Sequence, residues 1–94
     1  MVTSMNAGLA LIREAARRGY TIDVEGMDRH SSAEAAWLDV QAVEEATVRF
    51  TDRRGNRVGW AWIVNGLDDD EALADYGSGG WVGEYADRLF DGTA

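Results

Sequence analysis

The segment EATVRFTDRRGNRVGWAWIVN (residues 45–65) has the pattern of a β-hairpin, and the rest of the predicted fold is arranged around it. Its left arm alternates apolar and polar residues from Ala46 to Thr51, which is the period of a half-buried strand. The residues between the arms suit a type I turn, because Asp52 caps its start and Gly55 supplies the left-handed residue of a following bulge. The sequence therefore predicts two antiparallel strands joined by a tight turn.

The turn also sets a register for the two arms, since it pairs Asp52 with Asn56. Counting outward from that pair predicts three further pairs: Phe50 with Val58, Val48 with Trp60, and Ala46 with Trp62. The apolar alternation selects the same residues, so both arguments place them on one buried face of the sheet. The opposite face would carry Gly59, Ala61 and Ile63.

Helical and strand patterns precede the hairpin. A helix over about residues 5–18 is predicted from a cap at Ser4, a stop at Gly19 and a buried stripe of Met5, Leu9, Ile12 and Ala16. Alternation over residues 20–24 predicts a short strand with Tyr20, Ile22 and Val24 inward, followed by a loop over residues 25–30. A capping box at residues 31–34 opens a second helix, which runs to about Val43.

The chain after the hairpin is more ambiguous. Asp68 and Glu71 have the spacing of a capping box, which favours a short helix over residues 69–76, with a brief edge strand as the alternative. A glycine-rich joint follows at residues 77–80. The terminal segment, residues 81–90, predicts a helix that places Trp81, Val82, Tyr85 and Leu89 on one side.

These elements predict one α+β domain spanning residues 1–94, with a small three-stranded, mainly antiparallel sheet around the hairpin. The helices are expected to pack on the face of Val48, Phe50, Trp60 and Trp62 and to leave the other face open. Tryptophans are more typical of a core than of an interface, but a domain of 94 residues has little room to bury four indoles. Trp81, beside the glycine-rich joint, is the one expected to be partly exposed.

Composition favours a soluble protein of the bacterial cytoplasm. The 94 residues contain no cysteine, no signal-peptide pattern and no apolar run near the roughly 18 residues that a membrane span requires. The basic residues are all arginine, and alanine and glycine are abundant, which is typical of a GC-rich bacterial or phage genome.

The net charge of −8 is unevenly distributed along the chain. Residues 1–65 hold nine acidic residues and eight arginines, a balance of −1, whereas residues 66–94 hold eight acidic residues and one arginine, a balance of −7. Such a field repels nucleic acid and attracts basic partners. The predicted partner-binding residues are Asp68, Asp69, Asp70, Glu71, Asp75, Trp81, Glu84, Asp87 and Asp91.

Two readings of these acidic residues remain open. A dense stripe of carboxylates can imitate the phosphates of duplex DNA, which repeat about every 1.7 Å along the helix axis, and so occupy a basic DNA-binding groove. Alternatively, the acidic residues serve solubility alone, and the chain docks on a partner or dimerises through aromatic surface.

Metal, cofactor and catalytic motifs are not found. The acidic run at residues 68–71 lacks the alternating ligands of an EF-hand, and His30 is the only histidine. The glycines match no phosphate-binding loop. We therefore expect no metal, no cofactor and no enzymatic activity.

Four arginines gather on the hairpin, with Arg49 and Arg57 on the open face and Arg53 and Arg54 at the tip. A nucleic-acid contact would need aromatic side chains beside them on which bases stack, and the predicted register leaves none on that face. We therefore expect no direct binding of nucleic acid.

The chain resembles small acidic proteins of phages, prophages and plasmids. The resemblance is carried by DRRGNRVGW (residues 52–60), by Ala74-Asp75-Tyr76 and by RGYTI (residues 18–22). It implies that Gly55 is a turn residue, that Gly59 is a strand position with little side-chain bulk, and that Trp60 is a core anchor. It also implies a function like that of anti-CRISPR or anti-restriction proteins, namely a protein that binds a basic surface of a host nucleic-acid-binding defence complex.

Overall fold

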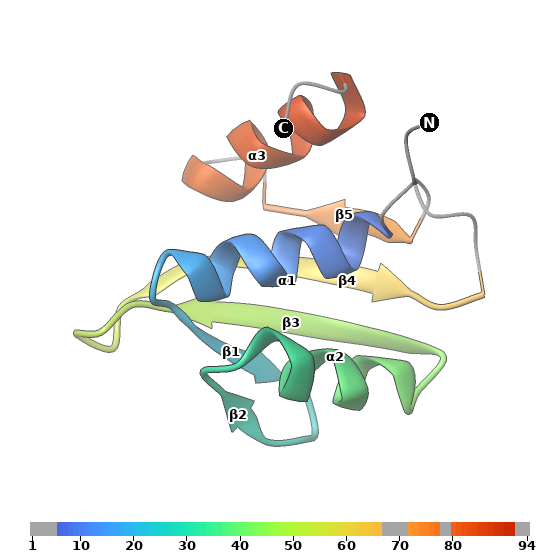
Figure 1. The fold of residues 1–94 in the computed structure, drawn as a ribbon, viewed down its shortest axis with the longest axis horizontal. Helices are drawn as coiled ribbons and strands as arrows, with labels where there is room; N and C mark the ends of the chain where they lie inside the picture. The colour runs from blue at the N-terminus through green and yellow to red at the C-terminus, as the bar shows by residue number, and fades with distance from the viewer. Residues whose placement is uncertain (1–5, 67–71, 78–79, 92–94) are drawn as a thin grey trace.

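The computed structural model describes residues 6–66, 72–77 and 80–91 (Figure 1). Within these described residues, three helices and five strands follow one another. In order they are α1 (Ala7–Arg17), β1 (Thr21–Val24), β2 (Arg29–His30), α2 (Ala33–Gln41), β3 (Glu45–Thr51), β4 (Arg57–Val64), β5 (Leu73–Tyr76) and α3 (Gly80–Asp91).

All strand pairs are antiparallel, and the sheet order is β2-β1-β3-β4-β5. The predicted α+β class and the central hairpin are confirmed, but the prediction of three strands is wrong. The two additional strands lie at the edges of the sheet, where β2 pairs with β1 over two residues and β5 pairs with β4. Residues 25–30 are therefore not entirely a loop, and residues 73–76 form the edge strand rather than a short helix.

Helix α1 begins and ends with specific caps. Asn6 is the N-cap, and its side chain accepts hydrogen bonds from the backbone N–H groups of Gly8 and Leu9, which have no partner inside the helix. The predicted cap at Ser4 lies outside the described residues. The helix ends at Arg17 with Arg18 as its C-cap, and Gly19 follows with a φ of 83°, as predicted for a left-handed stop.

Ser32 is the N-cap of helix α2, and its hydroxyl accepts a hydrogen bond from the N–H of Ala35. It ends at Gln41, two residues before the predicted end at Val43. Asn65 then ties this helix end to the end of β4, because its side-chain amide donates to the carbonyls of Val40 and Val43 at 2.6 and 2.7 Å.

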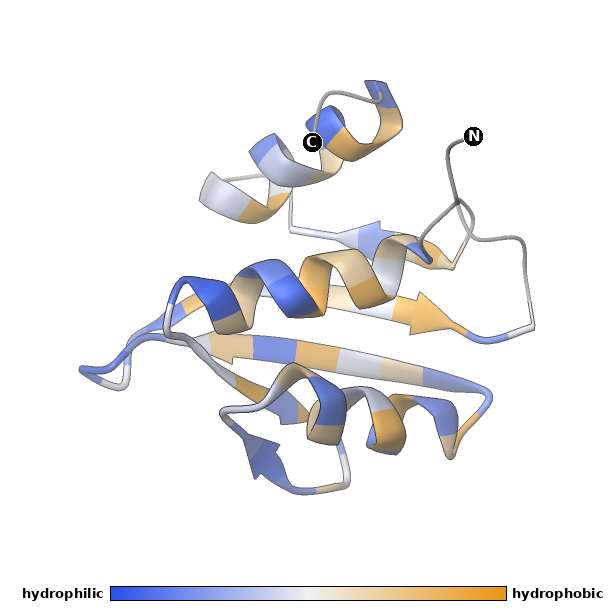
Figure 2. Cartoon of the chain, in the orientation of Figure 1, coloured by the Kyte–Doolittle hydropathy of each residue, from blue (hydrophilic) through white to orange (hydrophobic). Residues whose placement is uncertain are grey.

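The core lies between the helices and one face of the sheet. Buried side chains of all three helices belong to one cluster with the inward residues of the strands, including Val48 and Phe50 as predicted. In Figure 2 the colours alternate along β3, as a half-buried strand requires, and the end of β4 is hydrophobic. Among the described residues, no helix packs on the opposite face of the sheet.

The described part of the chain contains no helix with both the length and the apolar character needed to span a bilayer.

Candidate binding surface on the open sheet face

A register shift in the hairpin places two tryptophans on the face of the sheet opposite to the one predicted. The turn pairs Asp52 with Asn56 as predicted, and the N–H of Asp52 donates to the carbonyl of Asn56 at 2.9 Å. The register then shifts, because Thr51 pairs with Arg57 but Phe50 pairs with Gly59. Val58 is the extra residue of this bulge. A shift of one residue moves all the following side chains of β4 to the other face of the sheet.

The predicted pairs beyond the bulge are therefore wrong. Val48 pairs with Ala61 and Ala46 with Ile63, and Phe50 pairs with Gly59 rather than with Val58. Gly59, Ala61 and Ile63 face the core, while the side chains of Trp60 and Trp62 are 36% and 37% exposed on the open face. The prediction that Trp60 and Trp62 anchor the core is corrected accordingly.

Trp60 and Trp62 lie on the open face because α3 approaches β4 closely on the other face. A Cβ atom on Gly59 would lie only 2.5 Å from Cγ2 of Val82, which is shorter than any ordinary contact between these atoms. An indole cannot occupy a position that lacks room for a methyl group. The expectation that Gly59 is a strand position with little bulk is thus confirmed, and its small size is required by the helix above it.

Side chains of neighbouring strands form two rows across the open face, which we call the tryptophan face. The register aligns the first row as Arg29, Asp23, Arg49 and Trp60, and the second as Thr47, Trp62 and Asp75. The expectation that no aromatic residue shares this face with Arg49 is therefore wrong. Arg49 is the direct cross-strand neighbour of Trp60, and Asp75 is the neighbour of Trp62.

The charged residues of the tryptophan face are only loosely paired. Nη2 of Arg49 lies 3.5 Å from Oε1 of Glu25, and the Glu25 side chain is more than half exposed. An exposed ion pair of this kind contributes about 0–1 kcal/mol. Both groups therefore remain able to form stronger contacts with a partner that excludes water from them.

The orientation of Trp60 is restricted by the chain that leaves β5. A Cβ atom on Gly77 would lie 2.7 Å from Nε1 of Trp60, so the indole packs directly against the backbone of residue 77. The N–H of Gly77 also donates to the carbonyl of Trp60 at 3.3 Å. A side chain that is already held in position loses less entropy on binding than a free one.

Trp81 was expected to be partly exposed, and this expectation is wrong. Its side chain is 8% exposed, because it packs against Tyr20 and Phe50 at ring-centroid distances of 5.5 and 5.2 Å. The guanidinium of Arg18 covers the remaining side at 5.0 Å. A partner cannot reach this residue without opening the core.

The predicted acidic binding residues are distributed over more than one element. Asp75 is exposed on β5, in the row of Trp62. Glu84, Asp87 and Asp91 are exposed on α3, which packs on the opposite side of the sheet. The remaining predicted residues, Asp68, Asp69, Asp70 and Glu71, lie outside the described residues. The described acidic residues thus do not share one face with Asp75.

His30 has a defined partner in the structure. Its Nε2 lies 2.6 Å from Oδ2 of Asp39, so the contact joins β2 to α2. This contact does not extend into a metal site, since no group of three or more histidine, aspartate or glutamate residues suitable for a metal ion occurs among the described residues.

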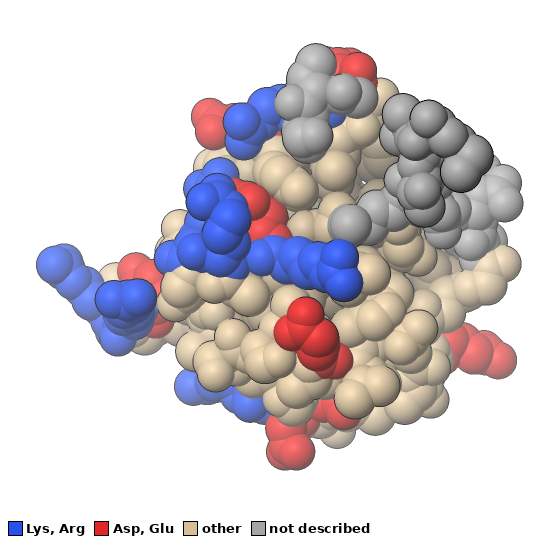
Figure 3. All heavy atoms as spheres, viewed as in Figure 1, with Lys and Arg blue, Asp and Glu red and all other residues tan. Residues whose placement is uncertain are grey.

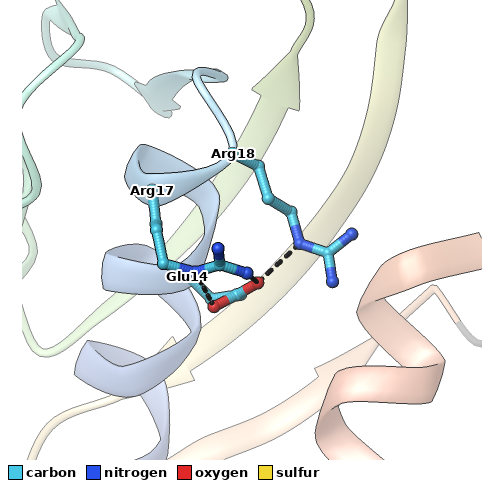
Figure 4. Close-up of polar contacts among 3 residues, drawn as sticks. All are labelled: Glu14, Arg17 and Arg18. Atoms are coloured by element: carbon cyan, nitrogen blue, oxygen red, sulfur yellow. Dashed lines mark hydrogen bonds and ion pairs between the residues drawn. The ribbon is translucent and has the colours of Figure 1, made fainter.

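A second polar cluster lies at the C-terminal end of α1 (Figure 4). Glu14 is buried, and its carboxylate accepts hydrogen bonds from Nε of Arg17 at 2.8 Å and from Nε of Arg18 at 2.7 Å. The hydrogen bond from Arg17 is the main reason that the pKa of Glu14 lies below its usual value of 4.5, although burial opposes this shift. The cluster fixes Arg18 where it covers Trp81.

This lowered pKa predicts a pH-dependent contribution of Glu14 to stability. An unfolded state with the ordinary pKa of 4.5 binds more protons than the folded state, so the stabilisation is present above that pH and is lost as the pH falls through the lowered pKa. Urea unfolding should show Glu14→Gln less stable than the parent at pH 7, with the difference shrinking below pH 4.5. Glu84→Gln, on the exposed side of α3, is the control. If the difference in stability between Glu14→Gln and the parent did not change with pH, the lowered pKa of Glu14 would be contradicted.

Comparisons with known proteins give no further guide to function. No family model, no curated protein and no solved structure matches the chain. The functional argument therefore depends on the surface itself.

Proposed function

We propose that the chain is a non-enzymatic docking module, which binds a partner protein through the tryptophan face. The observation that carries this proposal is the exposure of Trp60 and Trp62 side by side on a strand whose face has no described helix over it. Tryptophan and arginine are the residue types that most often dominate protein interfaces, and here Arg49 is the direct neighbour of Trp60.

The charges around the tryptophans define the chemistry of the partner. Arg49 and Arg57 lie toward the turn end of the hairpin, while Glu45 and Asp75 lie toward the other end. A complementary surface has an apolar centre, a carboxylate opposite the arginines and a cation opposite the acidic residues. Such charges at the rim mainly set the orientation and the rate of association.

A nucleic-acid strand fits this surface less well than a protein. Aromatic and arginine side chains on a sheet are typical of single-strand binding platforms. However, Asp23 and Asp75 occupy the same two rows, Glu25 and Glu45 lie beside them, and the chain carries a net charge of −8. These carboxylates repel a phosphate backbone, so the surface favours a protein partner.

Binding through the two tryptophans is tested by replacing both of them. The double variant Trp60→Thr, Trp62→Thr should lose its partner, with an affinity lower by about 30-fold or more, because a single interface anchor already contributes about 2 kcal/mol or more. Threonine retains the preference for a strand. The measurement is affinity capture from bacterial lysate, followed by surface plasmon resonance with the partner that it identifies.

The matched control is Leu38→Ala, which removes another exposed apolar side chain, 69% exposed, from α2 on the helix side of the molecule. This variant should bind like the parent, and circular dichroism should show all three proteins folded. Equal affinity of the parent and the double variant would contradict the proposal.

A second candidate function is favoured by the balance of −7 in residues 66–94. In this proposal the acidic residues bind the basic nucleic-acid site of a host defence complex, in the cytoplasm of a bacterium that carries the phage or mobile element. The same capture experiment separates the two proposals. The acidic mode predicts a partner that is released by salt and lost when Asp68, Asp69, Asp70 and Glu71 become amides, but is retained by the double tryptophan variant.

A further inference from the structure

Two turns far apart in the sequence line a shallow, open, basic depression of about 240 Å³. The turn after α1 contributes Arg18, Gly19 and Tyr20, and the turn between β3 and β4 contributes Asp52, Arg53 and Arg54. Figure 3 shows basic side chains gathered at the hairpin tip and over the C-terminal part of α1. Most of the charge in this depression is therefore positive, in a chain whose net charge is −8.

The single carboxylate of the depression is engaged in its own turn. Oδ1 of Asp52 accepts hydrogen bonds from the backbone N–H groups of Arg54 at 2.8 Å and Asn56 at 2.9 Å. The bond from Asn56 is the largest cause of a pKa of Asp52 below the usual value. Asp52 therefore forms its hydrogen bonds within its own turn, and among the described residues it accepts none from a guanidinium group.

The arginines differ in how many of their N–H donors already bind a carboxylate. Arg18 uses Nε for Glu14, and Figure 4 shows its two terminal nitrogens directed away from that carboxylate. Arg53 and Arg54 form no side-chain hydrogen bond or ion pair with any other described residue. By contrast, Arg17 and Arg49 both lie beside glutamates. Donors therefore remain available on all three arginines that line the depression.

The walls of the depression are held by the fold. Nη2 of Arg53 lies 3.1 Å from the place of a Cβ atom on Gly19, so its guanidinium lies against a backbone that carries no side chain. The φ of Gly19 is 83°, a conformation that side-chain-bearing residues rarely adopt. Tyr20, on the same side, packs against the buried Trp81. The site thus does not require a large rearrangement to accept a ligand.

We propose that this depression binds a phosphate group, either as free inorganic phosphate or as the phosphate of a small monoester. Guanidinium groups donate parallel hydrogen bonds that match the oxygens of phosphate, and three of the residues that line this depression are arginines. The volume lies below the roughly 300–1,000 Å³ of sites for drug-sized ligands, so the phosphate group itself is the principal recognised element.

The test uses inorganic phosphate and phenyl phosphate, titrated by calorimetry and by amide NMR shifts at an ionic strength held constant with sodium chloride. We expect saturable binding, with the shifts centred on the backbone amides of Gly19, Arg53 and Arg54. Arg53→Gln, Arg54→Gln together should raise the dissociation constant about tenfold or more, because charge-assisted hydrogen bonds are lost.

Arg29→Gln is the matched control, since Arg29 is another exposed arginine with no described partner but lies on β2, away from the depression. It should bind both probes like the parent. Equal affinity for the two probes would show that the phosphate oxygens alone are sufficient for binding. Binding of phenyl phosphate alone would instead identify a monoester as the ligand. Absence of saturable binding of either probe, or an equal loss in Arg29→Gln, would overturn the proposal.

Discussion

Replacing Trp81 with alanine is expected to lower the free energy of unfolding by about 3–5 kcal/mol, the range found for buried aromatic residues. The side chain joins three parts of the molecule, because it packs against Tyr20 after α1, against Phe50 on β3 and beneath Arg18. Small domains are stable by only about 5–15 kcal/mol, so this loss is a large fraction of the total. Urea unfolding followed by circular dichroism measures it directly.

Trp60→Ala provides the comparison for this prediction. Trp60 is 36% exposed and lies outside the core cluster, so its replacement should cost about 1 kcal/mol, as expected for a cross-strand pair on a sheet surface. If Trp81→Ala were no less stable than Trp60→Ala, the assignment of Trp81 to the core would be refuted. The two substitutions thus separate a residue that maintains the fold from one that is available for binding.

Gly59→Ala is expected to destabilise the fold by about 1–3 kcal/mol, although it adds only one methyl group. The new Cβ atom would lie 2.5 Å from Cγ2 of Val82 and 3.3 Å from Nε1 of Trp81. Neither neighbour can rotate freely, since Val82 is fully buried and Trp81 nearly so. The helix α3 must therefore move away from β4, or the strand must bend, and both changes disturb core packing.

The double variant Gly59→Ala, Val82→Ala tests the cause of this destabilisation. Val82→Ala alone leaves a cavity and is destabilising, but in the double variant the methyl group of residue 59 occupies part of that space. The double variant should therefore be more stable than the sum of the two single effects predicts, by about 0.5–3 kcal/mol. Strict additivity in urea unfolding would show that the contact between these two residues does not limit the approach of α3.

Local turn chemistry was sufficient to predict the hairpin but not its register. Asp52 and Gly55 act as predicted, and Gly55 has a φ of 86°. Beyond the turn, the sequence VGWAWIV is apolar on both of its alternating faces, so periodicity cannot choose between them. The choice is made by α3, which comes from a distant part of the chain and leaves room for glycine but not for an indole.

Strand β5, which the sequence predicts only as the alternative to a short helix, has a similar explanation. Residues 68–76 have local features of a helix start, but the N–H of Val64 donates to the carbonyl of Ala72 at 2.8 Å, and pairing with β4 continues from there. Tertiary contacts here override a weak local preference. β2 was missed because a two-residue strand carries no periodic pattern that could predict it.

The candidate binding surface was predicted only in part. Aromatic docking was among the expected functions, and Arg49 was correctly placed on the open face. The position of Trp81 beside the glycine-rich joint predicts partial exposure, whereas its packing against Tyr20 and Phe50 decides its actual exposure. The sequence does contain a pattern that indicates the exposed tryptophans. Gly59 and Ala61 alternate with Trp60 and Trp62, and the small residues are the ones that fit beneath a closely packed helix.

The two outer strands also limit how copies of this chain can aggregate. Unpaired strand edges are templates on which further chains add and grow into fibres. Here β2 is only two residues long and includes the exposed Arg29, while β5 has four residues and a register shift against β4. Short, charged and irregular edges are poor templates for continued growth. The described sheet can therefore expose two tryptophans on its face, while neither of its described edge strands offers a regular edge on which a neighbouring copy could polymerise.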